Sequence, residues 1–272
     1  MIKRTITGLA LTAFLFLALW GGGLWFAVPC VITTSLSFYE MIRATVQAGH
    51  DPVQWPCWLC FALSIPLYHY YGSVMLMMPL VGGTFMLISM TVIFRKEPKL
   101  EDITVSCLPL VSVLLPGMCM LGLQKAPGQL NQSMLLVLAF GVPLFGDTLA
   151  YFIGSHFGKR KLCPAVSPNK SIEGAVAGLG GSMLWALATA GVFSAFTSIP
   201  PLWHFLALGL LGGVAGQMGD LFASLVKRHC GIKDFSNIIP GHGGMMDRLD
   251  SVYWTAVIIY VYYNFAAHWF AA

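Results

Sequence analysis

Two carboxylates stand at the edges of apolar stretches of this sequence, where a charge is costly. Asp147 directly follows the charge-free run 126–146, and Asp220 directly follows the run 174–219. A carboxylate at membrane depth costs about 2–3 kcal/mol, so it normally faces a polar cavity or a charged partner. An ion pair that holds two helices together is the alternative for one isolated acid. The polar segments that follow each acid favour a functional site instead.

The densest polar segment of the chain is 224–251. Lys227, Arg228 and Lys233 supply cationic donors suited to a polyphosphate. Glycines in the turn 240–244 allow backbone N–H groups to face an anion. This segment therefore predicts a phosphate-binding turn beside Asp220.

Two further acids, Asp247 and Asp250, fall in the predicted first turn of the last helix. Negative charge is favourable there because of the helix dipole. Several carboxylates beside a phosphate-binding turn form a site of hard oxygen ligands, which suits Mg²⁺. Zinc would require Cys and His ligands instead. We take Asp220 and Asp247 as the main candidate metal ligands, and Asp147 and Asp250 as further candidates.

A second basic segment, 157–174, contains two groups of polar residues. Anionic lipid beside a cytoplasmic loop explains the first group, which is Lys159, Arg160 and Lys161. The second group, Ser167, Lys170 and Glu173, places a hydroxyl, a cation and an acid at the start of a helix, like a corner that binds phosphate. The chain has no P-loop and no Rossmann fingerprint, so nucleotide binding does not follow from those motifs.

The elements that position these residues must lie in a membrane. The 272 residues include 15 Lys plus Arg and 11 Asp plus Glu, which is 10% charged, against 57% hydrophobic. A soluble domain carries about 25% charged residues. This composition excludes a soluble enzyme, a disordered tail and a disulfide-stapled secreted domain. It indicates an all-α, polytopic integral membrane protein.

Charge-free runs predict the number of membrane spans. A spanning helix needs about 20 apolar residues. Three long runs, 5–39, 52–94 and 174–219, accommodate two helices each. Three shorter runs, 103–124, 126–146 and 251–272, accommodate one helix each, so about nine transmembrane helices are predicted. The expected breaks within the long runs are 21–23, 70–73 and 200–201. The first run is short for two full spans, so whether it spans twice is left open.

The positive-inside rule orients these spans. With nine spans, every Lys and Arg except Lys125 falls on the side of the N-terminus, which is therefore predicted to be cytoplasmic. All the acids also fall on or near that side. The sequence thus divides into N-terminal transmembrane helices over 1–130, about five spans, and a catalytic transmembrane region over 131–272 with cytoplasmic loops 155–173 and 227–249.

Three smaller patterns complete the prediction. Residues 1–23 resemble a signal peptide but lack a cleavage site, so an uncleaved first span is expected. Cys57 and Cys60 have CxxC spacing without a second pair, which indicates two buried residues rather than a redox or zinc site. Small residues between Gly209 and Ala223 allow close helix packing, with Asp220 and Ser224 on one face.

Taken together, the residues indicate a membrane enzyme with a cytoplasm-facing site for phosphates and Mg²⁺. Metal-assisted phosphoryl or nucleotidyl transfer on a substrate at the membrane surface is the natural reaction class.

The segment 224–250 resembles the signature of the phosphatidate cytidylyltransferase (CDP-diacylglycerol synthase) family. The signature's fixed positions are all met: Ser224, Lys227, Arg228, Lys233, Asp234, Pro240, Gly241, His242, Gly243, Gly244, Asp247, Arg248 and Asp250. A second block around Gly146-Asp147 and Ser167 to Gly174 is also similar, with Leu149 in place of glycine and Ser171 in place of threonine. The resemblance covers about 141–251, and the N-terminal half adds only hydropathy and Glu40.

The resemblance implies transfer of CMP from CTP to phosphatidic acid, which gives CDP-diacylglycerol and pyrophosphate. It implies Mg²⁺ and a second cation such as K⁺ at Asp220 and Asp247, with Lys227 as a further catalytic residue. The expected substrate-binding residues are Ser167, Lys170, Ser224, Arg228, Lys233, His242 and Arg248, although His242 is equally suited to shaping the turn. It also implies a homodimer in the inner membrane of a bacterium, without a nucleic-acid partner.

Two rival functions remain open on the sequence. One is a related CTP-dependent lipid kinase or a cytidylyltransferase that acts on another lipid. The other is an anion transporter, which would also have intramembrane acids and glycine-rich helices.

Overall fold

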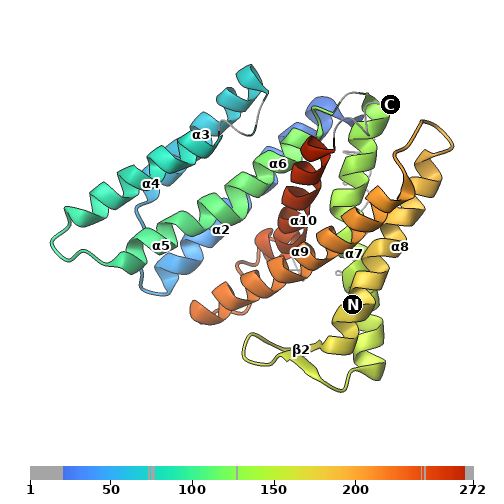
Figure 1. Ribbon diagram of the computed structural model, residues 1–272. Coiled ribbons are helices and arrows are strands. Elements are labelled where there is room, and N and C mark those ends of the chain that lie inside the picture. Colours follow the sequence, from blue (N-terminus) through green and yellow to red (C-terminus); the bar gives the residue numbers. More distant parts are fainter. Residues whose placement is uncertain are drawn as a thin grey trace.

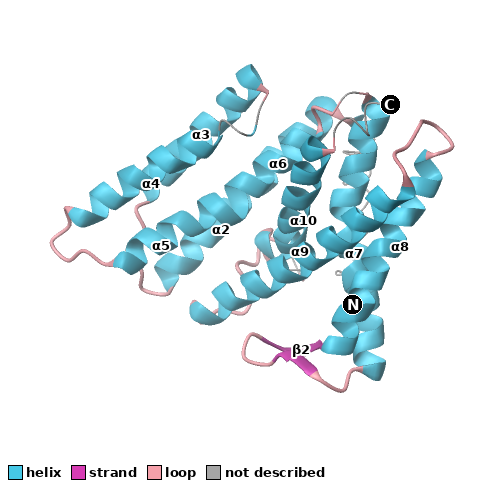
Figure 2. Ribbon diagram, viewed as in Figure 1, coloured by secondary structure: helices cyan, strands magenta, loops and turns pink. Residues whose placement is uncertain are grey.

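The computed structural model describes residues 21–72, 74, 77–126, 128–239, 241 and 243–266. These residues are mostly helical, with one small antiparallel hairpin (Figures 1 and 2). The elements in chain order are α2 (Gly23–Gln47), α3 (Gln54–Tyr71), α4 (Met77–Ile93), α5 (Leu100–Pro109), the π-helical segment η2 (Leu110–Leu114), α6 (Leu115–Leu123), α7 (Gln129–Phe157), β1 (Lys161–Cys163), β2 (Ser167–Ser171), α8 (Ile172–Phe193), α9 (Leu202–His229) and α10 (Met246–Phe265).

Several of these helices can cross a membrane. Within the described residues, five helical stretches are long and apolar enough: Gly23–Gln47, Leu100–Leu123, Gln129–Phe157, Ile172–Phe193 and Leu202–His229. The helix α4 is apolar but shorter. The prediction of an all-α, polytopic membrane protein is confirmed. The count of nine spans and the side of the N-terminus stay predictions, and the predicted first span lies largely outside the described residues.

The predicted breaks inside the long apolar runs are correct where the structure describes them. The helix α3 ends at Tyr71, and Gly72 follows with a φ of 66°, a left-handed conformation that suits glycine. Pro201, with ψ 143°, immediately precedes α9. Cys57 and Cys60 are both buried and unbonded to each other, as expected for two packed side chains.

The helices continue well past the charge-free runs that predicted them. The helix α2 passes through Glu40 and Arg43 to Gln47, α7 continues beyond Asp147 to Phe157, and α9 continues beyond Asp220 to His229. The two polar loops are correspondingly shorter than predicted, at 158–171 and 230–245. Charge does not end a helix, because the backbone hydrogen bonds continue once the helix leaves the apolar layer.

Glycines allow α9 to pack closely on two neighbouring helices. A Cβ at Gly213 would lie 2.7 Å from Ser182 Cβ on α8, and one at Gly216 would lie 2.9 Å from Thr255 Oγ1 on α10. A Cβ at Gly219 would lie 2.6 Å from the backbone oxygen of Asp250, also on α10. The predicted close approach of helices is therefore confirmed, and it involves two partner helices. In Figure 1, α9 crosses between α8 and α10.

Charged loops that are far apart in the sequence meet at one end of the helix bundle. Arg95 Nη1 lies 3.1 Å from Asp51 Oδ2, which joins the α4–α5 and α2–α3 loops. His50 and His229 approach to 3.2 Å, which joins the α2–α3 loop to the end of α9. The hairpin lies at the same end, at the bottom of Figure 1. We call this the charged end; Lys125 lies away from it, over the ring of Tyr68 at the ends of α3 and α6.

Candidate active site

A cavity of about 610 Å³ collects five carboxylates from four segments of the chain. Two come from the helices α7 and α9, one from the α9–α10 loop and two from α10: Asp147, Asp220, Asp234, Asp247 and Asp250. Lys227 and Arg248 also line it. We call this the acidic cavity. The structure thus brings together all four predicted metal ligands.

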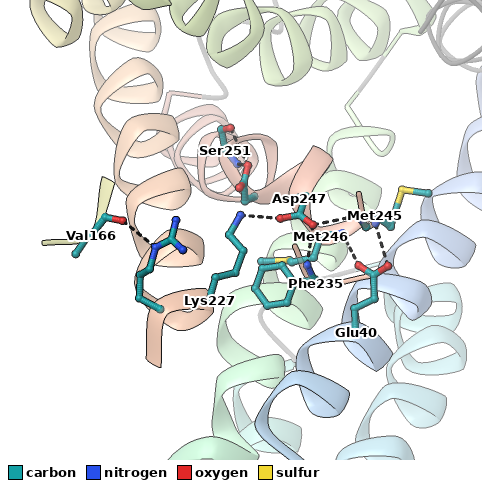
Figure 3. Close-up of polar contacts among 11 residues, drawn as sticks. Glu40, Val166, Lys227, Phe235, Met245, Met246, Asp247 and Ser251 are labelled. Carbon is teal, nitrogen blue, oxygen red and sulfur yellow. Dashed lines mark hydrogen bonds and ion pairs between the residues drawn. The ribbon is translucent and has the colours of Figure 1, made fainter. Parts of the chain in front are cut away.

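Asp247 is the most extensively hydrogen-bonded of these carboxylates, as Figure 3 shows. Lys227 Nζ donates to its Oδ1 over 2.6 Å. The N–H groups of Phe235 and Gly244 donate to its Oδ2 over 2.8 and 3.0 Å. Its side chain is only 3% exposed. These charge-assisted bonds fix the carboxylate on the first turn of α10, facing the end of α9.

Asp220 forms an ion pair with Lys170 of β2, and each side chain is 27% exposed. This contact joins the middle of α9 to the hairpin. Because Asp220 lies well inside α9, the lysine must reach inward from the hairpin to neutralise it. The predicted metal ligand and the predicted phosphate-binding lysine are thus direct partners.

Asp147 and Asp250 lie on either side of Ser251. The Ser251 hydroxyl donates to Asp250 Oδ1 over 3.0 Å and approaches Asp147 Oδ2 at 3.5 Å. Asp250 is 6% exposed, and the N–H of Ser251 donates to the same oxygen over 2.7 Å. One hydroxyl therefore links the carboxylates of α7 and α10 at the base of the acidic cavity.

A second cavity of about 670 Å³ adjoins the first, and Asp147 and Asp220 line both. It is formed by α7, the hairpin, the start of α8 and α9. Its polar lining includes Lys161, Asn169 and Lys170. We call it the basic cavity. Both cavities thus combine cations with carboxylates, and they share Asp147 and Asp220.

Local structure explains how the hairpin presents these cations. Residue Lys161 pairs with Ser171 in the two-stranded sheet. Ser171 then caps α8, because its hydroxyl accepts the N–H of Gly174 over 3.1 Å. Glu173, in the first turn of α8, accepts the N–H of Lys159 over 3.1 Å and also the N–H of Arg160. Glu173 therefore binds the backbone at the start of the hairpin, and the phosphate-binding role of this corner stays a prediction.

The glycine turn leads into a run of N–H groups that face carboxylates of the protein itself. Gly241 and Gly243 have φ of 77° and 82°, so the turn needs glycine at both positions. The N–H groups that follow are already used by carboxylates of the protein: Gly244 donates to Asp247, and Met245 and Met246 donate to Glu40. Two carboxylates of the protein thus bind the N–H groups at the end of the turn, and the binding of a substrate phosphate by the turn stays a prediction.

The remaining predicted residues lie nearby in different settings. Arg248 lines the acidic cavity. Arg228 is exposed, and its Nε donates to the Val166 carbonyl of the hairpin over 3.5 Å. Lys233 is exposed in the α9–α10 loop, Ser167 is half-buried in β2, and Ser224 is half-buried one turn after Asp220. His242 lies outside the described residues.

Sequence reasoning left two residues of the site without a role. Asp234 lines the acidic cavity, and only its place beside Lys233 in the family pattern indicated it. Glu40 is completely buried and binds the start of α10. Its signal was an acid that directly follows the apolar run 5–39, yet nothing in the sequence connected it to a segment 200 residues away.

The donor chemistry of the acidic cavity suits Mg²⁺ bound together with phosphates. Within the described residues, no group of three or more His, Cys, Asp or Glu side chains is placed to hold a metal by itself. Mg²⁺ commonly takes one or two carboxylates and completes its octahedral shell with water and substrate phosphates. The carboxylates that line this cavity meet that requirement, and the described lining residues include neither His nor Cys.

Comparison with known proteins relates this chain to cytidylyltransferases. A family model described as "Cytidylyltransferase family" matches residues 2–266. The phosphatidate cytidylyltransferase of Bacillus subtilis is 44% identical over 115 residues, 42% of this chain and 41% of that protein. The phosphatidate cytidylyltransferase of Staphylococcus saprophyticus is 37% identical over 172 residues, which is 63% of this chain and 63% of that protein. That of Synechocystis is 40% identical over 128 residues, which is 46% of this chain and 42% of that protein. Each alignment thus covers less than two thirds of the relative's length.

Proposed function

The chain belongs to the cytidylyltransferase family, and from this premise we propose that it transfers CMP from CTP to phosphatidic acid in a membrane. The products are CDP-diacylglycerol and pyrophosphate. The similar proteins of Bacillus, Staphylococcus and Synechocystis carry the name of this activity. Family membership disfavours an anion transporter, because the name of the family describes transfer of a cytidylyl group and not movement of a solute.

One structural observation supports this function above the others: two cavities share Asp147 and Asp220 as a wall. The reaction joins two anionic substrates, so each phosphate needs its own cationic surroundings while the reacting atoms meet at one point. We assign the triphosphate of CTP to the acidic cavity, beside Lys227 and Arg248. We assign the phosphate of the lipid to the basic cavity, beside Lys170 and Lys161.

The chemistry requires positioning and charge neutralisation more than proton transfer. An oxygen of the lipid phosphate forms a bond to the α-phosphorus of CTP, and the bond from that phosphorus to the β-phosphate oxygen breaks. Pyrophosphate leaves with the electron pair. A phosphate monoester is largely ionised near pH 7, so its oxygen attacks without a general base. The chain's own task is to orient two phosphates in line.

The carboxylates would hold Mg²⁺, with Asp220 and Asp247 as its main ligands and Asp147, Asp234 and Asp250 close by. When bound, Mg²⁺ neutralises charge on the triphosphate and on the leaving pyrophosphate. A second cation such as K⁺ belongs to the same proposal. Lys227 then neutralises the phosphates beside it, while Arg228 and Lys233 guide the nucleotide to the cavity from exposed positions. Ser167 and Ser224 serve as hydroxyl donors at the edges of the site.

The proposal also covers location and assembly. The charged end would face the cytoplasm of a bacterial cell, across its inner membrane, because basic loops stay on the cytoplasmic side. CTP is supplied there as well. A homodimer is part of the proposal on family resemblance.

The decisive experiment incubates purified protein with CTP labelled at the α-phosphate and Mg²⁺. Phosphatidic acid, dolichol and an ether-lipid phosphate serve as parallel acceptors. We expect label in CDP-diacylglycerol with phosphatidic acid only. CDP release with dolichol, or a labelled product formed only from the ether lipid, would show that the protein is a relative acting on another lipid. Anion uptake into vesicles without CTP consumption would support a transporter.

A further inference from the structure

Glu40 is a buried carboxylate without a cationic partner among the described residues. It lies in α2, two turns before the end of that helix, and is 0% exposed. The ion pairs within the described part of the chain involve other acids. A charge in such surroundings persists only if hydrogen bonds compensate for its lost hydration. The donors that compensate Glu40 therefore indicate what it is built to hold.

All three donors belong to the segment that leads into α10. The N–H of Met245 and the hydroxyl of Ser236 donate to Oε1, over 3.0 and 2.5 Å. The N–H of Met246 donates to Oε2 over 2.8 Å. Figure 3 shows the Glu40 side chain directed at this backbone, beside Asp247. A residue of the N-terminal half thus binds the segment that carries catalytic candidates.

This contact replaces a cap that α10 lacks. The residue at the cap position is Met245, whose side chain makes no capping hydrogen bond. The first N–H groups of a helix have no acceptor within the helix, and a carboxylate beside them is also favoured by the helix dipole. Glu40 supplies that carboxylate from α2. Asp247 supplies the acceptor for Gly244, so two acids together bind three successive N–H groups.

The glycine at 244 fits this arrangement sterically. A Cβ at this position would lie 2.6 and 2.8 Å from the two carboxylate oxygens of Glu40. Atoms at such distances overlap, so any other residue at 244 would push Glu40 or the turn aside. Glu40 and Gly244 are therefore matched to each other, although they lie in different halves of the chain.

We infer that Glu40 is a positioning residue: it holds the first turn of α10 so that Asp247 faces Lys227 and the acidic cavity. This inference rests on the proposed function for the identity of the reaction. The inference goes beyond the proposed function by placing a functional residue in α2, outside the segments that line either cavity. Loss of Glu40 would leave the backbone N–H groups of Met245 and Met246 unsatisfied, and the turn that carries Asp247 would shift to find other acceptors.

The test compares Glu40→Gln with Asp102→Asn. Asp102 is also a buried acid of the N-terminal half, 4% exposed, and it pairs with Arg95 over 2.9 Å at the charged end. Both substitutions remove one buried negative charge, so both are expected to lower the unfolding temperature. Only Glu40→Gln disrupts the contact to α10, because it replaces one of the two acceptor oxygens by an NH₂ group that cannot accept an N–H. Ser236→Ala forms a milder third variant, because it deletes one donor and keeps both N–H bonds.

Two measurements separate positioning from general stability. Binding of Mn²⁺ to the purified, lipid-reconstituted protein, followed by electron paramagnetic resonance, reports the metal site without any turnover. Supporting groups of metal ligands typically contribute about 10–100-fold in affinity, and we expect a loss of that size for Glu40→Gln, a smaller loss for Ser236→Ala and none for Asp102→Asn. Hydrogen exchange of the peptides that cover 241–249 should accelerate in Glu40→Gln and not in Asp102→Asn.

Each result decides the inference. Unchanged Mn²⁺ affinity and unchanged exchange in folded Glu40→Gln would overturn it, as would equal losses in Asp102→Asn. Absence of Mn²⁺ binding by the unaltered protein would overturn the metal site and the inference together. If the unaltered protein binds Mn²⁺ but forms no CDP-lipid, and Glu40→Gln still weakens binding, the positioning role stands and only the proposed reaction fails.

Discussion

Lys170 and Asp220 are ion-paired to each other on the boundary between the two cavities. Lys227 and Asp247 form a second such pair in the acidic cavity. In both pairs, a cation suited to phosphate neutralises a carboxylate suited to a metal. If a metal and the substrate phosphates were bound, the carboxylates would hold the metal and the lysines would hold the phosphates, so that no charge would be left uncompensated.

The first prediction concerns the two paired carboxylates. Asp220→Asn and Asp247→Asn each keep the shape of the side chain and remove the charge that a metal requires. We expect CDP-lipid formation to fall at least about 1,000-fold in each, the size of effect that removal of a key electrostatic group produces. The protein should remain folded and inserted, because Asn can still accept a hydrogen bond.

The matched control is Asp51→Asn, an acid that is 80% exposed at the same end of the bundle. It should retain normal turnover. Near-normal turnover in either Asp220→Asn or Asp247→Asn would exclude these residues as the main metal ligands. Size-exclusion profiles and thermal unfolding of all three variants verify that the comparison is between folded proteins.

Metal removal provides the second prediction. EDTA should stop CDP-lipid formation, and added Mg²⁺ should restore it, because five carboxylates around one cavity repel a triphosphate unless a cation lies between them. Zn²⁺ is expected to be a poor substitute, since the described residues that line the cavity include neither His nor Cys. Full activity after exhaustive chelation would contradict the proposal.

Much of the fold could be predicted because the membrane restricts the choices. Apolar runs must be helices there, and backbone preference alone places Gly72 at the end of α3 and Pro201 before the start of α9. The charged ends of α2, α7 and α9 were underestimated, because hydropathy reports where the apolar layer ends and not where a helix ends. The small hairpin was missed, since strands of three and five residues produce no periodic pattern.

Prediction of the site succeeded for residue types and failed for some of their partners. Carboxylates at Asp147, Asp220, Asp247 and Asp250 could be grouped from the sequence because charge near an apolar layer is rare and costly. Which group binds which could not be predicted. Glu40 reaches α10 across about 200 positions, and only the packing of α2 against α10 makes that contact possible.

The third prediction separates the two lysines by substrate. Lys170 lines the basic cavity and Lys227 the acidic cavity. Lys170→Ala should raise the KM for phosphatidic acid more than that for CTP, and Lys227→Ala should do the reverse. Loss of one charge-assisted bond corresponds to about 1.5–3 kcal/mol, or roughly 10–150-fold. Equal effects of both variants on both substrates would contradict the assignment of one phosphate to each cavity.

The last prediction uses glycine as a steric probe of the Glu40 contact. Gly244→Ala places a methyl group 2.6 Å from a Glu40 oxygen, so this variant should reproduce the weakened Mn²⁺ binding of Glu40→Gln. Gly180→Ala is the control, because no atom lies within 4 Å of its Cβ and it lies within α8. In the control, stability should stay equal or rise by up to about 1 kcal/mol, the helix preference for alanine. If Gly244→Ala binds Mn²⁺ as tightly as Gly180→Ala does, the turn tolerates displacement of Glu40 and does not need it for alignment.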